Sequence, residues 1–335
     1  MNKLPFIIAV LTLLAGLSSC QKEREGKYTP KEKVQSVYQE QTWYQNDEVV
    51  RQEAKYKSEE WTWANDQLDS IIYYEQHTYQ SEDETEIWYE KISTQQFTYD
   101  KDGRLTKSEI VGYFNIIGFT SIVATCEYDG KYLKSITVTE EGEFVESYQF
   151  NHNGKQITSF DLTLSNNLIE KDKKAMQLLD RVNPLRFILD VEIATKVMFT
   201  TQECVKRASK ADIKANNVVH FDMTWEGDNV SRIAGNYMGA TMQYDITYDK
   251  KNNPFYNLFG IANTVYQGFL LSTPICKHNV TGISLTLTGS EGETSPTESV
   301  AITYTYNNKD YPTSRTQNTT DGDDGYEQTY YYEYK

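Results

Sequence analysis

The chain has 335 residues, of which 39% are hydrophobic and 24% are charged, and its formal net charge is −15. This length can bury the core of one large domain or of two smaller ones. The acidic balance argues against nucleic-acid binding, because such proteins need a basic surface to displace counterions from phosphate. It also argues against electrostatic docking on anionic lipid headgroups.

The N-terminus has the organisation of a lipoprotein signal. A short positive start at residues 1–3 precedes an uncharged run at residues 5–17 that is too short to cross a bilayer as a helix. The run ends in Leu17-Ser18-Ser19-Cys20, which resembles the bacterial lipobox, whose cysteine is acylated and becomes the first mature residue. We expect residues 1–19 to be a signal peptide and Cys20 to be anchored in membrane lipid. An ordinary secretory signal that happens to contain a cysteine is the alternative.

The polar residues after the cysteine predict a tether at 20–33, followed by one β-rich domain at 34–335. Residues 21–25 resemble the Lys-plus-acid signals of Bacteroidetes surface lipoproteins. The residue after Cys20 is not the Asp that indicates inner-membrane retention. We therefore expect a lipid-anchored protein of the outer membrane that faces the periplasm or the cell surface.

Three cysteines remain besides Cys20, namely Cys126, Cys204 and Cys276, and no two are close enough in sequence to indicate a metal site. The simplest interpretation is three buried, small apolar side chains. One disulfide with a leftover thiol is the alternative.

Apolar and polar residues alternate with period two over most of the chain. In residues 219–225, for example, Val219, Phe221, Met223 and Trp225 alternate with His220, Asp222 and Thr224. Such alternation predicts antiparallel strands with one packed face and one solvated face. A parallel α/β sheet would instead show continuous aliphatic runs between helices.

The predicted turns share one pattern. An aromatic residue closes a strand, a polar group rich in Asn, Asp and Gly turns the chain, and an apolar residue opens the return strand. Asn, Asp and Gly suit such turns because they tolerate positive φ. The pattern occupies residues 63–68, 99–105, 128–133, 150–157, 225–230, 248–254 and 306–312. Its spacing is irregular, which predicts a series of hairpins and not a strict solenoid repeat.

One stretch, residues 168–216, interrupts the hairpins and is predicted to be an inserted segment. Asn183 and Pro184 suit the N-cap and first turn of a helix, and apolar residues follow at helical spacing. We expect one helix near 184–200, although the many Val, Ile, Phe and Thr residues also permit a strand.

Two of the turn segments carry a family resemblance. Trp225-Glu226-Gly227-Asp228-Asn229 and residues 248–255 (YDKKNNPF) resemble a Bacteroidetes lipoprotein family of unknown function with a porin-like fold. The hairpin at residues 99–105 is similar to the tyrosine–aspartate repeats of bacterial surface proteins. The resemblance covers residues 60–335. It implies an all-β fold, a large antiparallel meander whose sheet is strongly curved or partly closed like a barrel, and it implies no activity.

No catalytic motif is recognisable in the sequence: it has no His-Glu-x-x-His, no Gly-x-Ser-x-Gly, no phosphate loop and no Rossmann glycines. His220 and Asp222 share the polar face of one predicted strand and could ligate a metal or act as an acid–base pair. A solvated ion pair is the simpler interpretation. We predict no enzyme activity, no catalytic residues, no cofactor and no metal site.

The aromatic surplus is the strongest indication of binding. The sequence has 26 Tyr, 13 Phe and 5 Trp, and many of them crowd the first third of the chain. Trp43, Trp61, Trp63 and Trp88 are the candidate binding residues, because aromatic rings on a solvated face stack on sugars or anchor protein partners. The alternative is that they form cross-strand pairs that stabilise the sheet.

The leading prediction is thus an outer-membrane or surface lipoprotein, a non-enzymatic β scaffold that binds an envelope partner. A glycan-binding module that uses exposed aromatics is the alternative, and a hydrolase with an unrecognised carboxylate pair is a third. A membrane-spanning barrel is not expected, because a lipobox and a mean hydropathy of −0.64 suit a tethered soluble domain.

Overall fold

The computed structural model describes residues 27–46, 48–80, 85–114, 118–165, 218–237, 240–258, 275–288, 292, 294, 298–321 and 324–335. Within these residues the fold consists of 16 β-strands in one sheet. The strands are β1 (Val34–Gln45), β2 (Glu48–Ala64), β3 (Gln67–Gln80), β4 (Thr85–Tyr99), β5 (Leu105–Phe114), β6 (Gly118–Asp129), β7 (Tyr132–Glu140), β8 (Glu143–Asn153), β9 (Gln156–Leu164), β10 (Val218–Glu226), β11 (Asn229–Tyr237), β12 (Ala240–Tyr248), β13 (Val280–Thr288), β14 (Glu298–Tyr306), β15 (Pro312–Asp321) and β16 (Asp324–Tyr334).

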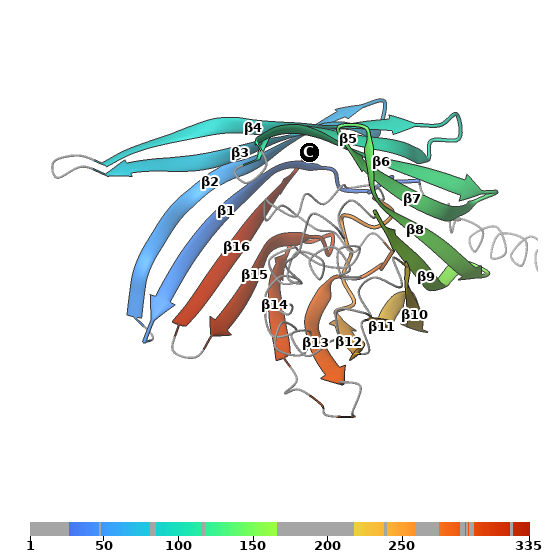
Figure 1. Cartoon of the computed structure of the whole chain (residues 1–335). Helices are drawn as coiled ribbons and strands as arrows, with labels where there is room; N and C mark the ends of the chain where they lie inside the picture. Colours follow the sequence, from blue (N-terminus) through green and yellow to red (C-terminus); the bar gives the residue numbers. More distant parts are fainter. Residues whose placement is uncertain are drawn as a thin grey trace, which may run out of the picture.

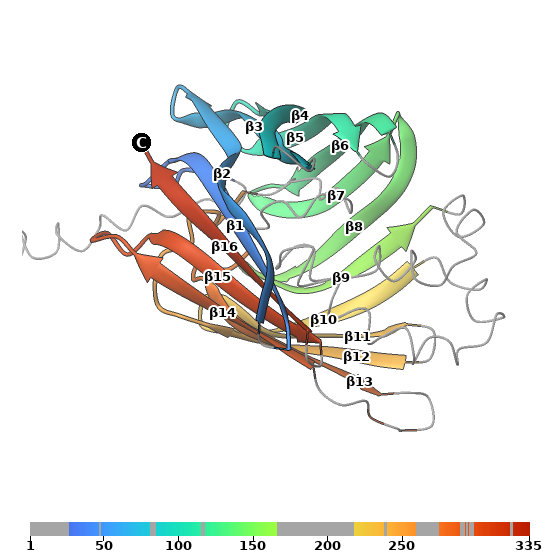
Figure 2. The same ribbon diagram turned by 90° about the vertical axis from the view of Figure 1, so that its left-hand side faces the viewer.

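The sheet closes into a barrel. Each strand pairs antiparallel with the next along the chain, and β1 pairs with β16 to complete the circle (Figures 1 and 2). The predicted all-β antiparallel meander is therefore confirmed, and its closure is complete. The predicted helix near 184–200 and the whole of the inserted segment 168–216 lie outside the described residues. No helix in the described part of the chain has the length and apolarity needed to cross a bilayer.

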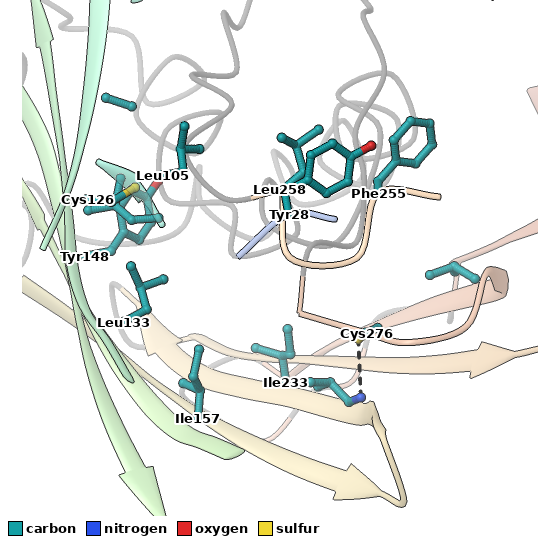
Figure 3. Packing of buried hydrophobic residues seen from close by; sticks show 14 of the residues in the cluster. Tyr28, Leu105, Cys126, Leu133, Tyr148, Ile157, Ile233, Phe255, Leu258 and Cys276 are labelled. Atoms are coloured by element: carbon teal, nitrogen blue, oxygen red, sulfur yellow. Dashed lines mark hydrogen bonds between the residues drawn. The ribbon is translucent and has the colours of Figure 1, made fainter. Parts of the chain in front are cut away.

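The apolar faces of the strands point into the barrel. One cluster of buried side chains draws members from strands around the whole circumference, which can meet only on the inside. Figure 3 shows part of it, with Leu105, Cys126 and Tyr148 on neighbouring parts of the wall. Tyr28, Phe255 and Leu258, from segments outside the strands, lie together within the same core.

The opposite, exposed face of the wall is polar. It carries ion pairs such as Lys107 Nζ–Glu109 Oε2 at 2.7 Å and Arg232 Nε–Asp245 Oδ1 at 2.6 Å. The period-two alternation read from the sequence thus corresponds to an apolar interior and a solvated exterior.

We call the barrel end at which β1 begins and β16 ends the proximal end, and the opposite end of the strands the distal end. In Figure 2 the chain terminus after β16 lies at the left, and the arrowheads of β9 and β13, which mark distal ends, lie at the right. The segment before β1 contacts the proximal end: Lys27 lies with Gln67 beside Gly103, and Lys33 pairs with Asp66. A tether that leads from Cys20 to Lys27 would therefore reach the barrel at its proximal end.

All the turn motifs predicted from the sequence lie at the proximal end, and the same kind of contact recurs in or beside them. At the end of an even-numbered strand, an aromatic or imidazole side chain bonds to the backbone carbonyl near the start of the preceding odd-numbered strand. The pairs are Trp63–Val34 (2.7 Å), Tyr99–Leu68 (2.8 Å), Tyr128–Leu105 (2.9 Å), His152–Leu133 (2.6 Å), Trp225–Ile157 (2.6 Å), Tyr304–Val280 (2.8 Å) and Tyr334–Pro312 (2.7 Å). We call these contacts the aromatic clamps.

On β12 a cysteine completes the same pattern. The Tyr248 hydroxyl lies 3.1 Å from Cys276 Sγ, which also accepts a hydrogen bond of 3.5 Å from the Val230 backbone N–H on β11 (Figure 3). The clamps therefore join the two strands of each pair where no hairpin turn connects them.

The segment that carried the family resemblance folds back into the proximal end. Asn253 accepts a bond from the Phe255 N–H at 3.0 Å and donates one to the Cys276 carbonyl at 2.8 Å. The Tyr28 hydroxyl donates to the Pro254 carbonyl at 2.8 Å. These bonds place the Phe255 ring 5.9 Å from the ring of Trp61. The turn therefore contributes Phe255 and Leu258 to the buried core of the barrel.

Candidate functional site

Two hairpin arms diverge at the distal end. The β1–β2 arm comprises residues 43–53 and the β3–β4 arm comprises residues 74–91. Ladder pairs between β2 and β3 run only from Ala64↔Gln67 to Glu59↔Tyr73. Beyond that point the two arms separate, and Figure 1 shows β3 and β4 extending away from the end of β2.

The β3–β4 arm is a two-stranded ribbon. The pairing of β4 with β5 ends at Ser93↔Gly112, so residues 85–91 have a ladder partner only in β3. Residues 76–80 of β3 likewise have a ladder partner only in β4. Within the described chain, both outer edges of this ribbon therefore lack a ladder partner, although β2 still contacts the arm through the Tyr56 ring, which stacks on that of Tyr89 with centroids 5.9 Å apart. A ribbon of this kind is marginally stable alone and presents backbone donors and acceptors at its edges.

The large apolar side chains that are exposed gather in the distal halves of the strands. In the described residues they are Val49, Val50, Tyr79, Ile87, Trp88, Tyr89, Val111, Phe144 and Val218. The β3–β4 arm contributes three of the four aromatics in this set, Tyr79 at 61%, Tyr89 at 53% and Trp88 at 44% exposure, and the fourth is Phe144 on β8. A cluster of exposed apolar side chains at one end of a molecule is typical of an interaction surface.

Cross-strand register divides the arm residues between the two faces of the ribbon. Directly opposite residues of two paired strands share a face. One face of the ribbon therefore carries three such pairs: Glu75↔Glu90, His77↔Trp88 and Tyr79↔Glu86. Tyr89 and Ile87 face the other side. The His77 and Trp88 rings stack with centroids 5.3 Å apart, and His77 Nε2 lies 3.3 Å from Glu90 Oε2. The first face is therefore both aromatic and acidic.

The four predicted binding tryptophans occupy different environments. Trp61 is only 4% exposed and its Nε1 donates to Glu59 Oε2 at 2.7 Å in the barrel interior. Trp63 is half-buried and forms an aromatic clamp. Trp43 is half-buried on the β1–β2 arm, where the Arg51 guanidinium lies 4.5 Å from its ring centroid. Trp88 alone among the four is exposed, so the structure places two of the residues in the arms and two in the interior.

A polar layer inside the wall is not recognisable in the sequence. The Tyr73 hydroxyl donates to Gln95 at 2.6 Å, and Gln95 donates to Ser108 at 2.6 Å, across β3, β4 and β5. Burial raises the pKa of the Tyr73 hydroxyl, and the nearby Glu59 carboxylate adds to that shift. The period-two pattern of the strands predicts that these side chains point inward. The sequence does not predict which partner each of them contacts. Their bonds brace the wall at the base of the β3–β4 arm.

A second cluster lies on the solvated face at the base of the arms. Lys55 Nζ lies 4.0 Å from the Tyr331 ring centroid and 5.0 Å from that of Tyr38. The Tyr331 hydroxyl donates to Glu40 at 2.8 Å. Desolvation, followed by this bond to Glu40, raises the pKa of Tyr331 to about 12. The Lys55 ammonium lies over both rings, so this cluster ties β16, β1 and β2 together.

The structure adds a residue to the predicted His220–Asp222 pair. His220 Nδ1 lies 2.6 Å from Asp161 Oδ1, and its Nε2 lies 3.3 Å from Asp222 Oδ1. The bond to Asp161 is the main cause of a raised His220 pKa. Both ring nitrogens face carboxylates, which fits an imidazolium held as an ion pair. Nowhere in the described residues do three or more His, Cys, Asp or Glu side chains converge to hold a metal ion.

Two of the cysteines are buried and carry free thiols, Cys126 and Cys276. Burial raises the pKa of Cys126 to about 12 and that of Cys276 to about 11. Cys204 lies outside the described residues. For the two described thiols, the interpretation as buried small side chains is confirmed.

Fold and site together define a closed antiparallel β-barrel with an apolar interior, a clamped proximal end and projecting distal arms. The sequence matches no family model and no curated protein.

The solved structures that are similar to this one include two porin-like proteins. A porin-like protein from Bacteroides uniformis ATCC 8492 has 12% sequence identity and a TM-score of 0.44, over 90% of this chain and 98% of that one. A porin-like protein from Bacteroides vulgatus ATCC 8482 has 11% identity and a TM-score of 0.37, over 91% of this chain and 99% of that one. The family that the turn motifs resemble also has a porin-like fold. Lipid attachment and the tyrosine–aspartate repeat type stay predictions.

Proposed function

We propose that this chain is a lipid-anchored, non-enzymatic envelope scaffold that binds a partner protein through its distal arms. The observation that carries the proposal is the distribution of exposed apolar side chains, which gather at the end of the strands opposite the contacts of Lys27. A surface at that end is turned away from the point at which a tether reaches the barrel. It is therefore free to meet another component of the envelope.

The lipid anchor is supported by the sequence of residues 1–20 and by the length of the tether. Only seven residues separate Cys20 from Tyr28, whose ring is buried in the barrel interior. A fully extended stretch of this length spans roughly 30 Å, so the proximal end would stay near the membrane. Substitution Cys20→Ala should move the protein from the membrane fraction to the soluble fraction. Retention of the variant in the membrane would contradict the anchor.

The distribution of polarity supports a barrel that stands in water. Barrels of the outer membrane expose an apolar band to lipid and turn polar residues inward. Here the buried cluster lies inside, and the exposed face carries ion pairs such as Lys107–Glu109 and Arg232–Asp245. Placing such charges against lipid would cost about 2–4 kcal/mol for each Lys or Arg near the bilayer midplane, and less for each Asp or Glu.

The direct test is crosslinking and affinity capture of the lipidated protein from intact cells. We expect an envelope protein in stoichiometric amount, and we expect the double variant Tyr79→Ser/Trp88→Ser to lose it. The control variant Thr106→Ser alters a described position near the proximal end and should capture as the wild type does. Capture of nothing specific by the wild-type protein would overturn the proposal.

A glycan ligand is the second candidate, and the exposed ring of Trp88 is the observation that favours it. Aromatic rings on a solvated face stack on sugar rings. Addition of envelope polysaccharides should then quench or shift tryptophan emission in the wild type and leave Trp88→Phe emission unchanged. Equal emission with and without carbohydrate would exclude this candidate.

A further inference from the structure

We propose that the proximal end of the barrel binds the anionic phospholipid headgroups of the membrane through a rim of lysine side chains. The surface consists of the described residues outside the strands at this end: 27–33, 65–66, 100–104, 130–131, 154–155, 227–228, 249–258, 275–279, 307–311 and 335. We call these residues the basic rim. The inference goes beyond the proposed function, in which the acyl chains alone hold the protein to the membrane.

The basic rim has a charge of opposite sign to that of the whole chain. It holds twelve Lys or Arg residues and seven Asp or Glu residues, whereas the formal net charge of the chain is −15. The strand-terminal residues of the same end add Asp129 and Glu226 and leave the surplus positive. The net charge argued against docking on anionic lipid, but it does not describe this end of the molecule.

The acidic side chains of the basic rim are engaged within the rim itself. Six of them form ion pairs, which are Lys33–Asp66, Arg104–Asp100, Arg104–Asp102, Lys277–Asp228, Lys251–Asp310 and Lys309–Glu32. The seventh, Asp249, accepts hydrogen bonds from the backbone N–H groups of Lys251 and Asn279 at 2.8 and 3.1 Å. The carboxylates are therefore compensated at short range, and the surplus charge belongs to other lysines.

Five exposed lysines supply most of this surplus: Lys31, Lys101, Lys131, Lys155 and Lys250. None of them forms an ion pair with another residue in the described part of the chain. They belong to the segment before β1 and to the turns after β4, β6, β8 and β12, so they are distributed around the barrel. An extended anionic surface can contact several of them at once, and each lysine near such a surface strengthens binding about five-fold.

The position of the tether supports a membrane as the occupant. Lys27 belongs to the basic rim, and seven residues separate Cys20 from the buried Tyr28, so the anchor would hold this end beside the headgroups. The acidic arms are too distant to oppose the contact. Glu86 lies 13 residues before the proximal end of β4, about 40 Å along an extended strand. The Debye length is only about 8 Å at physiological ionic strength.

The basic rim offers charge and not apolar surface. Every exposed large apolar residue of the described chain lies in a strand, and none belongs to the rim. Insertion of apolar side chains into the bilayer therefore does not contribute to the contact. The contact is electrostatic, and salt should reverse it completely.

The first test asks whether this surface holds the protein to a membrane without acyl chains. The mature chain with Cys20→Ala keeps every described residue and is mixed with vesicles of phosphatidylcholine, either alone or with phosphatidylglycerol at three to one. At low ionic strength, flotation should recover at least about ten-fold more protein with the anionic vesicles. The difference should vanish in 1 M NaCl, where the Debye length is about 3 Å. Equal binding to both vesicles, or binding that survives the salt, would overturn the proposal.

The second test assigns the contact to the basic rim. Lys131→Gln/Lys155→Gln removes two of its exposed cations and should weaken binding to the anionic vesicles by at least about ten-fold. Lys55→Gln/Lys91→Gln removes the same charge from β2 and β4, away from the rim, and should leave binding unchanged. Equal losses with the two variants would refute the rim as the binding surface. Binding to vesicles in which lipopolysaccharide replaces phosphatidylglycerol, without binding to phosphatidylglycerol, would refute phospholipid as the ligand.

The third test uses the lipidated protein in the same two kinds of vesicle. Lys101, Lys131 and Lys155 should be acetylated by a water-soluble amine reagent more slowly in the anionic vesicles, as measured by mass spectrometry. Lys91, on β4, should react at the same rate in both. Equal rates in both vesicles at all four lysines would overturn the proposal. The lipid anchor and the docking of a partner by the distal arms would then still stand, because neither depends on the basic rim.

Discussion

At the scale of single residues, the aromatics of this protein divide by where their polar atoms lie. In the aromatic clamps, a hydroxyl, an indole N–H or an imidazole nitrogen reaches a backbone carbonyl near the start of the neighbouring strand. Tyr99, for example, donates to the Leu68 carbonyl at 2.8 Å, and burial raises the pKa of its hydroxyl. The hydroxyl therefore stays protonated and remains a donor throughout the physiological pH range.

Removal of one clamp should cost a measurable part of the stability. Tyr99→Phe keeps the ring and leaves the Leu68 carbonyl without this donor, so the free energy of unfolding should fall by about 1 kcal/mol. Urea denaturation followed by far-UV circular dichroism would measure it. Tyr79→Phe removes a hydroxyl from a ring that is 61% exposed and should change stability little. Equal effects of the two substitutions would show that the clamp bonds do not contribute.

His220 makes a pH-dependent contribution of known sign. Its bond to Asp161, and then the one to Asp222, raises its pKa, so the folded state binds the proton more tightly than the unfolded state. The stabilisation is complete below the unfolded pKa of about 6.5 and is lost as pH rises through the higher folded pKa. Because the side chain is exposed, the effect on stability is small.

An NMR titration would measure the His220 pKa directly. We expect a value above about 6.5 in the wild type and a lower one in Asp161→Asn, which removes the main partner. Asp245→Asn changes a carboxylate on β12 that pairs with Arg232, and it should leave the His220 titration unchanged. A His220 pKa that Asp161→Asn does not lower would contradict the assigned cause.

At the scale of elements, the departure of the β3–β4 arm from the wall depends on a close approach of β5. Gly112 faces Ser93 at the last ladder pair between β4 and β5. A Cβ at residue 112 would lie 2.3 Å from both Ser93 Cβ and the Ile92 carbonyl oxygen. Only glycine therefore allows the strands to meet at this point without a shift of backbone.

Gly112→Ala should accordingly destabilise the barrel by about 1–3 kcal/mol, the usual cost of overpacking. Thermal unfolding would show it as a lowered Tm. Val111→Ala, at the neighbouring position, shortens a side chain that is partly exposed and should have a smaller effect. An unchanged Tm for Gly112→Ala would mean that β5 can move away from β4 without cost.

The strands were predictable from the sequence, while the arms were not. Alternation depends only on which face is packed, so β10 and β12 could be recognised from their own residues. The β2–β3 ladder ends where the two hairpins diverge. No local sequence pattern predicts the position of that divergence. Trp61 and Trp88 illustrate the result: both belong to aromatic-rich strands, but one contacts Glu59 in the core and the other lies on the arm.

At the scale of the whole molecule, the two ends of the barrel have different chemistry. The proximal end combines the turn motifs, the aromatic clamps and the inward fold of residues 252–258. The distal end carries the exposed apolar side chains. The turn motif recurs at the proximal end of successive hairpins, whereas the lengths of the strands and of their distal connections vary. The spacing of the motifs along the sequence is therefore irregular. In the proposed arrangement, a tether at the clamped end would leave the arms free to contact a partner.

This orientation predicts unequal distances from the membrane. In a Cys204→Ser background, a fluorophore attached at Asp102→Cys, in the proximal turn after β4, should be quenched strongly by lipids that carry a headgroup quencher. A fluorophore at Val50→Cys, on the β1–β2 arm, should be quenched weakly, because β2 extends for 17 residues between the distal and proximal ends. The buried thiols of Cys126 and Cys276 should remain unlabelled in the folded protein. Stronger quenching at residue 50 would mean that the arms contact the membrane that carries the anchor, and docking on a protein partner would then need another surface.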